Sequence, residues 1–277
     1  MISESTVNEM CATALKLRHD VLEMIGINTA GHLGGSFSLA ETMAVLYFYR
    51  MKLSKDNRHD PNRDRLILSK GHAALIQYAA LCEKGFFPRE ELKRTKTLKG
   101  LLQGHPDLSI PGLEAVTGSL GQGLSVGVGM ALALRLDKSP ARVFVIMGDG
   151  EQSEGQIWEA SQAAAAYNVD NLTAFIDWNK IQATGSTDIF SIPNLDGKWA
   201  AFGWEVFKVD GHNPAEIIEA IEKADAVKGR PSLIILDTIK GKGISFAEGN
   251  AAYHNGIFDE AAWNRALEEL NAAGVRK

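Results

Sequence analysis

The sequence has few of the features that mark secreted or membrane-spanning proteins. Its two cysteines, Cys11 and Cys82, are too few for a disulfide framework, and both lie in apolar helical patterns, so we expect two reduced core thiols. No window reaches the ~18 consecutive apolar residues of a membrane-spanning helix. The N-terminus also lacks the basic and apolar regions of a signal peptide. We therefore expect a cytoplasmic protein that does not bind a membrane.

Neither sign of charge dominates the chain. In 277 residues, 29 Lys and Arg against 34 Asp and Glu leave a net charge of −5, which gives nucleic acid no basic surface. Hydrophobic residues make up 45% and charged residues 23%, values that exclude a disordered or collagen-like chain. No internal repeat and no linker rich in Pro, Gly or Ser divides the sequence, and α/β sheets often run to ~250 residues as one domain. We expect residues 1–277 to form a single domain.

Short apolar runs alternate with helical patterns along the chain. Strands are expected at 66–68, 143–147, 172–176, 205–209 and 233–236. Helices are expected at 5–27, about 39–49, 155–167, 214–227 and 259–270. Two further helices are expected, one that begins near residue 72 and one that ends near residue 136. A glycine-rich turn is expected at Gly31, Gly34 and Gly35. Unbroken apolar strands that alternate with helices predict an α/β fold, with a parallel sheet covered by helices on both faces.

Polar residues follow two consecutive strands of this predicted sheet. Gly148-Asp149-Gly150 comes directly after one strand, and Asn179, 30 residues after Asp149, follows the next. One crossover would place both side chains at neighbouring strand ends, where α/β sheets bind ligands. Mg²⁺ prefers oxygen ligands and keeps several that are not protein, while the following helix N-terminus favours a phosphate. Gly-Asp-Gly alone is also compatible with a plain strand-to-helix turn, but together with Asn179 it favours a metal–diphosphate site.

Histidines gather in glycine-rich contexts. A lone histidine is more often structural, but several on loops at element ends are candidates for function. Four histidines directly follow a glycine: His32, His72, His105 and His212. His254, in Tyr253-His254-Asn255-Gly256, is a fifth candidate. His19 and His59 lie in charged stretches and have no assigned role.

The segment 117–123, Thr-Gly-Ser-Leu-Gly-Gln-Gly, opens an apolar helix. Glycine at this density permits a close approach of the backbone to a ligand. The alternative is tight helix packing through Gly123, Gly127 and Gly129. Packing suits these later glycines, whereas Gly118 and Leu120 belong to the turn.

In this order the motifs resemble the amino-terminal, diphosphate-binding portion of transketolases, the thiamine diphosphate enzymes. The resemblance covers nearly the whole chain. The matching segments are Gly148-Asp149-Gly150 with Asn179, 63–65 through 69–73, Gly104-His105-Pro106, 117–123, and Tyr253-His254.

The resemblance implies a role for each matching residue. Asp149, Asn179 and the carbonyl of Ile181 would hold Mg²⁺, for which Ca²⁺ or Mn²⁺ can substitute. His32, His105 and His254 would be catalytic, facing the thiazolium and the substrate. Gly150 and His72 would contact the diphosphate, 118–120 would lie on the aminopyrimidine side, and Glu154 would lie where two cofactor sites communicate. The full set of cofactor contacts would be His72, Gly118, Ser119, Leu120, Gly150, Glu154, Asn179 and His254.

The chain departs from the family in two places. Most transketolases have proline after the first histidine, whereas Leu33-Gly34-Gly35-Ser36 here looks more like deoxyxylulose-phosphate synthase. The sequence also lacks the second domain, which binds the aminopyrimidine ring, activates the cofactor and grips the sugar phosphate. The resemblance therefore implies a split transketolase. A C-terminal partner subunit would carry the pyrimidine-binding domain in an α2β2 heterotetramer, and a two-carbon ketol unit would pass from a ketose phosphate to an aldose phosphate.

Three other interpretations remain open. The chain could be the α subunit of a different thiamine diphosphate enzyme, either similar to deoxyxylulose-phosphate synthase or a 2-oxo acid dehydrogenase. His72, His105 and the segment 118–123 argue against the dehydrogenase. A non-catalytic regulatory subunit is opposed by the intact Asp149 and Asn179. The chain could also be a truncated piece of a longer protein.

Overall fold

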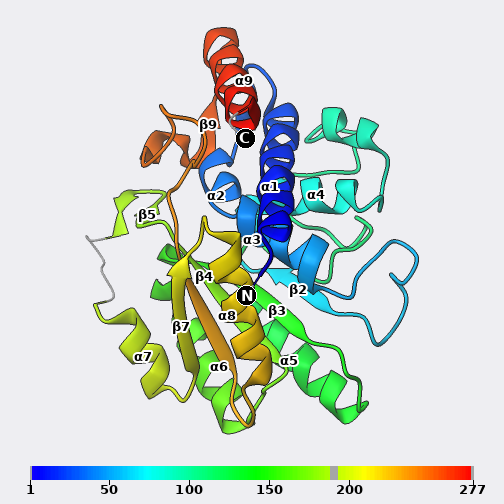
Figure 1. Cartoon of the computed structure of the whole chain (residues 1–277), viewed down its shortest axis with the longest axis vertical. Helices are drawn as coiled ribbons and strands as arrows, with labels where there is room; N and C mark the ends of the chain where they lie inside the picture. The colour runs from blue at the N-terminus through cyan, green and yellow to red at the C-terminus, as the bar shows by residue number, and fades with distance from the viewer. Residues whose placement is uncertain (1, 188–192, 276–277) are drawn as a thin grey trace.

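The structure, a computed structural model, describes residues 2–187 and 193–275, and its centre is a five-stranded sheet (Figure 1). All neighbouring strands of this sheet are parallel. The strands in spatial order are β2 (Arg65–Leu68), β3 (Val143–Gly148), β4 (Leu172–Trp178), β8 (Ser232–Asp237) and β7 (Glu205–Asp210). The predicted fold class is confirmed.

The central strands are apolar at nearly every position because both faces of the sheet are buried. Alternate residues of a strand point to opposite faces. Accordingly Val143, Val145 and Met147 of β3 enter one hydrophobic core, whereas Phe144 and Ile146 enter the other. A strand buried on one side only would show alternation of apolar and polar residues instead.

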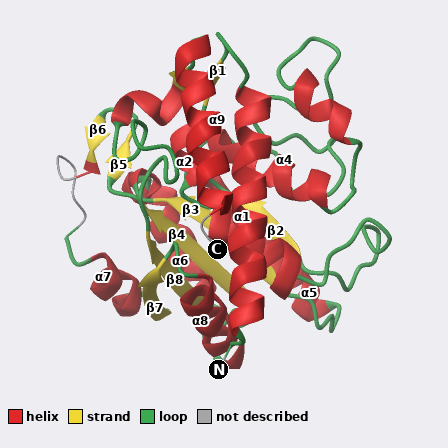
Figure 2. Cartoon of the chain, turned by 45° about the horizontal axis from the view of Figure 1, so that its top comes forward, coloured by secondary structure: helices red, strands yellow, loops and turns green. Residues whose placement is uncertain are grey.

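Helices form a layer on each face. One core contains residues of α5 (Gln122–Leu136), α6 (Gly155–Ala166) and α7 (Leu195–Ala201). The other contains residues of α1 (Glu4–Ile25), α3 (Ala40–Ala44), α4 (Ala74–Glu83), α8 (Pro214–Ala226) and α9 (Glu260–Val275). Figure 2 shows α1, α8 and α9 on the same side of the sheet. Helix α8 connects β7, at the edge of the sheet, back to β8, which is the direction opposite to the earlier connections. A right-handed crossover in this reversed direction places the helix on the opposite face of the sheet.

Short elements connect these layers. The π-helical turn η1 (Val45–Arg50) extends α3, and single 3₁₀ turns lie at the starts of helices and in loops. The 3₁₀ turns are η2 (Gly71–Ala73), η3 (Arg89–Arg94), η4 (Gly150–Ser153) and η6 (Ala251–Asn255). Two-residue strands outside the central sheet are β1 (Ala30–Gly31), β5 (Ile181–Gln182), β6 (Gly185–Ser186) and β9 (Gly256–Ile257). The antiparallel pair β1–β9 joins Gly31 to Gly256, so two segments far apart in sequence lie together.

Two expectations about local structure are wrong. The predicted glycine-rich turn is instead the buried helix α2 (Leu33–Phe37). Gly34 has a packing reason there, because a Cβ would lie 2.8 Å from Lys240 Cγ and 3.0 Å from the Tyr253 carbonyl oxygen. Cys11 is exposed on α1, while Cys82 is buried; both thiols are free. Within the described residues, no helix combines the length and hydropathy needed to cross a membrane.

The glycines of α5 offer a matched pair of substitutions. A Cβ at the buried Gly127 would overlap Val145 Cγ2 in β3, whereas a Cβ at the exposed Gly129 would meet nothing within 4 Å. We expect Gly127→Ala to lower the free energy of unfolding by about 1–3 kcal/mol through overpacking. Gly129→Ala should raise it by about 0.5–1 kcal/mol, since alanine favours a helix. Denaturant titrations of both variants measure this, and equal effects would contradict the packing assigned to Gly127.

Candidate active site

A cavity of about 510 Å³ opens at the carboxyl ends of the sheet strands. Parallel α/β sheets bind ligands at this edge because loops and helix N-termini converge there. The cavity is lined by His32, Gly35, Lys70, His72, Gly118, Leu120, Gly148, Asp149, Gly150, Glu151, Ser153, Glu154, Asn179, Ile181, Gln182, Ala183, Thr184, Lys240 and His254.

Asp149 and Asn179 reach the cavity from neighbouring strands. Gly148 of β3 pairs with Asp177 of β4, so the residues after each strand end lie side by side. The Gly150 backbone N–H donates to Asp149 Oδ1 at 2.7 Å, and the Lys180 N–H donates to Oδ2 at 2.5 Å. Burial, with the nearby charge of Asp177, raises the pKa of Asp149 to about 6. Asp149 is therefore a carboxylate whose charge is poorly compensated by the protein.

The donors around Asp149 fit Mg²⁺. Within the described residues, no group of three His, Cys, Asp or Glu side chains is placed to hold a metal ion. An ion at Asp149 would therefore take its other ligands from amide or carbonyl oxygens, such as those of Asn179 and Ile181, and from a bound ligand. Mg²⁺ accepts this mixture, because it is usually held by one or two carboxylates together with phosphate oxygens and water.

Three histidine rings cluster at the cavity. The ring centroids of His72 and His254 are 5.0 Å apart and nearly stacked, and His32 lies 5.3 Å from the first and 5.6 Å from the second. The β1–β9 pair explains this meeting, because His32 follows β1 directly and His254 comes just before β9. His105 is exposed beside the cluster, its ring 6.1 Å from that of His32.

These three clustered rings are neutral near pH 7. Burial is the largest cause and lowers the pKa of His32 and of His254 to about 4, and that of His72 to about 2. The positive charge of Lys240 adds to each shift. Lys240 Nζ also donates to His254 Nδ1 at 2.8 Å, which leaves the proton of the neutral ring on Nε2.

Two buried lysines in the cavity were not among the residues predicted from the sequence. Lys240 donates to the carbonyl oxygen of Ile181 at 2.6 Å, and burial with the charge of Lys70 lowers its pKa to about 8. Lys70 donates to the carbonyl oxygen of Gly35 at 2.8 Å. A signal for Lys240 was present, because Thr238-Ile239-Lys240-Gly241 follows strand β8 just as Asp149-Gly150 follows β3.

The charges of the cavity favour an anionic ligand. The clustered histidines are neutral, but the charge of Lys70 helps to lower the pKa of Lys240, so two buried ammonium groups repel each other here. A polyanion would relieve this repulsion, and the start of η4 at Gly150 borders the same cavity. A diphosphate with Mg²⁺ therefore fits both the crowded cations and Asp149.

The structure brings most of the predicted site residues to one place. All of them line the cavity except His105 and Ser119, which are exposed next to it. The ring of His105 lies against Gly118, where a Cβ would come within 3.0 Å of His105 Cδ2. Glu154 is at the exposed rim, before α6.

His212, singled out for its adjacent glycine, is not at the cavity. The Ile239 N–H donates to its Nε2 at 2.9 Å, which places the ring proton on Nδ1, 3.1 Å from Glu41 Oε2. Glu41 in turn pairs with the buried Arg18. This histidine therefore links the loops that follow β7 and β8 to helix α3.

The protonation of the cluster can be checked by NMR. In the unliganded chain, the ring resonances of His32, His72 and His254 should stay in the neutral form from pH 8 to about 5.5, because their pKa values lie at or below about 4. The unfolded chain binds protons near pH 6.5. The unfolding free energy should therefore fall as the pH drops from about 6.5 towards 4. Titration of all three rings near pH 6.5 would contradict the burial described here.

Comparison with known proteins places the chain among transketolases. Residues 9–270 match the family described as transketolase, thiamine diphosphate binding domain. The chain is 48% identical to the 6-deoxy-6-sulfo-D-fructose transketolase subunit SqwG of Clostridium sp. (strain MSTE9), over 94% of this chain and 95% of that protein. It is 40% identical to an apulose-4-phosphate transketolase subunit of Phocaeicola vulgatus, over 92% of each chain.

Solved transketolase structures share the fold. The transketolase from Leishmania mexicana matches with a TM-score of 0.89 and 28% identity, and the transketolase from Campylobacter jejuni with a TM-score of 0.89 and 30% identity. These matches cover 95% and 98% of this chain but only 41% and 43% of the other chains. The chain thus spans nearly the whole length of the two subunits above, and about two fifths of these longer transketolases.

Proposed function

This chain belongs to the transketolase family through its thiamine diphosphate-binding domain, and from that premise we propose that it is one subunit of a split transketolase. The single domain would comprise residues 1–277. A partner subunit would carry the pyrimidine-binding domain, in an α2β2 heterotetramer in the cytoplasm. Two relatives that are named as transketolase subunits, and whose lengths this chain nearly matches, support the division into two chains.

One observation supports the cofactor site above all others. Asp149 and Asn179 enter the same cavity from neighbouring strand ends, beside two buried lysines. In the proposal, Asp149, Asn179 and the Ile181 carbonyl hold Mg²⁺. Gly150, His72 and Lys240 hold the diphosphate, and 118–120 lie along the aminopyrimidine side.

When bound, thiamine diphosphate supplies the electron sink that makes cleavage of a carbon–carbon bond beside a carbonyl feasible. The chain supplies proton transfer and orientation at the substrate. His254 presents its Nε2–H as a donor because Lys240 occupies Nδ1. His32 is neutral near pH 7 and can accept a proton from a substrate hydroxyl, while the exposed His105 can hydrogen-bond the same sugar chain.

The proposed substrates are sugars with an anionic group. The names of the two relatives specify a sulfo sugar and a sugar phosphate, which supports a ketose phosphate or a similar anionic ketose as the donor and an aldose phosphate as the acceptor. A two-carbon ketol unit would pass between them.

The test begins with calorimetry. The chain, alone and then mixed with a candidate partner encoded beside it, is titrated with thiamine diphosphate in the presence of Mg²⁺. Binding followed by ketol transfer between sugar phosphates would support the proposal. Absence of binding with the partner present would favour a regulatory subunit, and release of CO₂ from pyruvate without ketol transfer would favour a decarboxylating enzyme.

A further inference from the structure

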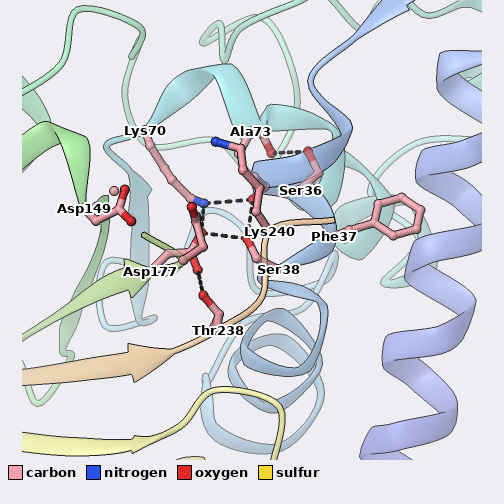
Figure 3. A network of polar contacts seen from close by, with 12 residues as sticks. Ser36, Phe37, Ser38, Lys70, Ala73, Asp149, Asp177, Thr238 and Lys240 are labelled. Carbon is pink, nitrogen blue, oxygen red and sulfur yellow. Dashed lines mark hydrogen bonds and ion pairs between the residues drawn. The ribbon is translucent and has the colours of Figure 1, made fainter. Parts of the chain in front are cut away.

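A buried polar network surrounds Asp177, two residues before Asn179 (Figure 3). Its centre is Asp177, at the end of β4, whose side chain is fully buried. Three side chains contact it: Lys70 from just after β2, Ser38 from the residue after α2, and Thr238 from the residue after β8.

Asp177 receives hydrogen bonds from four side chains. Ser38 Oγ donates to its Oδ2 at 2.7 Å and Thr238 Oγ1 to its Oδ1 at 2.5 Å, and the Lys70 ammonium makes an ion pair with Oδ2. The fourth donor is Asn179 Nδ2, 2.9 Å from Oδ2. The buried Lys70 ammonium makes an ion pair with this side chain, and the Ser38 and Thr238 hydroxyls donate to it. Asp177 is therefore an ionised carboxylate, which can only accept hydrogen bonds.

This chemistry determines which way the Asn179 amide faces. An amide has one donor end and one acceptor end, and only the donor end can meet a carboxylate. With Nδ2 turned towards Asp177, Oδ1 is turned the other way. Oδ1 accepts from the Ile181 N–H at 3.2 Å, and an amide oxygen has a second lone pair with which it can bind a cation.

We propose that Asp177 is a positioning residue that fixes the Asn179 amide so that its oxygen is presented to a divalent cation. The inference rests on the proposed function, because the cation is the Mg²⁺ assigned to Asp149 and Asn179. Residues behind a metal ligand commonly orient it, and their loss costs about 10–100-fold in metal affinity. Asp177 is not among the residues that line the cavity, so it reaches the site through the lining residues it holds, Asn179 and Lys70, and of these only Asn179 is a proposed ligand of the cation.

The test is a reciprocal exchange of the two side chains. Asn179→Asp keeps an oxygen towards the cavity but removes the donor that Asp177 requires. Asp177→Asn/Asn179→Asp restores a donor–acceptor pair with its direction reversed. Asp177→Asn alone is the matched reference, because its amide oxygen can still accept from Asn179. For each variant, calorimetry gives the ratio of thiamine diphosphate affinity in Mg²⁺ to that in EDTA.

We expect Asn179→Asp to lower this ratio at least about tenfold in the wild-type background and less than about threefold in the Asp177→Asn background. Equal effects in both backgrounds would overturn the inference. If Asp177→Asn alone does not fold, the exchange decides by itself, since recovery over Asn179→Asp supports the inference and no recovery overturns it.

Thr238→Val separates positioning from stability. It removes a hydrogen bond to Asp177 Oδ1 but leaves the contact between Oδ2 and Asn179. We expect a lower thermal midpoint and a metal-dependence ratio within about threefold of the wild type. A ratio that falls as far as in Asn179→Asp would show that the network is merely structural and would overturn the inference. Failure of the wild-type chain to bind thiamine diphosphate with its partner present would instead count against the proposed function.

Discussion

Asp149→Ala is expected to lower the Mg²⁺-dependent affinity for thiamine diphosphate at least about a hundredfold. Removal of a residue behind a metal ligand already costs about 10–100-fold, and Asp149 is a proposed ligand itself. It is also the one carboxylate of the proposed ligand set, because Asn179 and Ile181 offer only neutral oxygens. Calorimetric titration of thiamine diphosphate at saturating Mg²⁺, with and without EDTA, measures the loss.

The same substitution at Asp137 serves as a control. Asp137 is an exposed residue at the end of α5, at the opposite end of that helix from the turn that lines the cavity. Asp137→Ala should leave the affinity unchanged. Unchanged affinity in Asp149→Ala, with the fold confirmed by circular dichroism, would refute the metal site.

Lys240→Met is expected to weaken thiamine diphosphate binding about tenfold to a hundredfold. Its ammonium is buried in the cavity, where its partners within the described residues are the neutral Ile181 carbonyl and His254 ring. An anionic ligand would therefore be its natural counter-charge. A hydrogen bond to a charged group contributes about 1.5–3 kcal/mol, and each 1.4 kcal/mol is about a factor of ten in affinity. Methionine keeps most of the length of the stem that packs against Gly34.

The loss should depend on the phosphates of the ligand. Unlike that of Asp149→Ala, it should persist in EDTA, and it should be absent when thiamine without phosphate replaces thiamine diphosphate. Lys242→Met is the control, since Lys242 is two residues further on, partly exposed and 3.7 Å from Glu248. Equal weakening for thiamine and thiamine diphosphate would contradict the role assigned to Lys240.

The sheet could be predicted well from the sequence because its central strands are buried on both faces. Runs such as 143–147 and 172–176 are then almost continuously apolar and easy to recognise. The same strands led to Asp149 and Asn179, since polar residues directly after a strand lie at the ligand-binding edge.

Contacts between distant segments could not be predicted in this way. Helix α2 was missed because glycine is unfavourable in helices, and only the packing of Lys240 and Tyr253 against Gly34 explains its position. The network at Asp177 joins four segments, so the pattern of any one strand shows the carboxylate without its partners. Cys11 shows the opposite error, since an apolar pattern around a residue does not bury that residue.

The two-residue pairing of β1 with β9 also constrains the order in which the protein becomes competent during its synthesis. His32 emerges from the ribosome early, but its neighbour His254 is held in place by a pairing that needs Gly256 and Ile257. Every strand of the central sheet is translated before that point. A nascent chain can thus complete its sheet and most of the packing around it while the histidine cluster is still unfinished, so the histidines proposed to face the substrate are among the last residues to be placed.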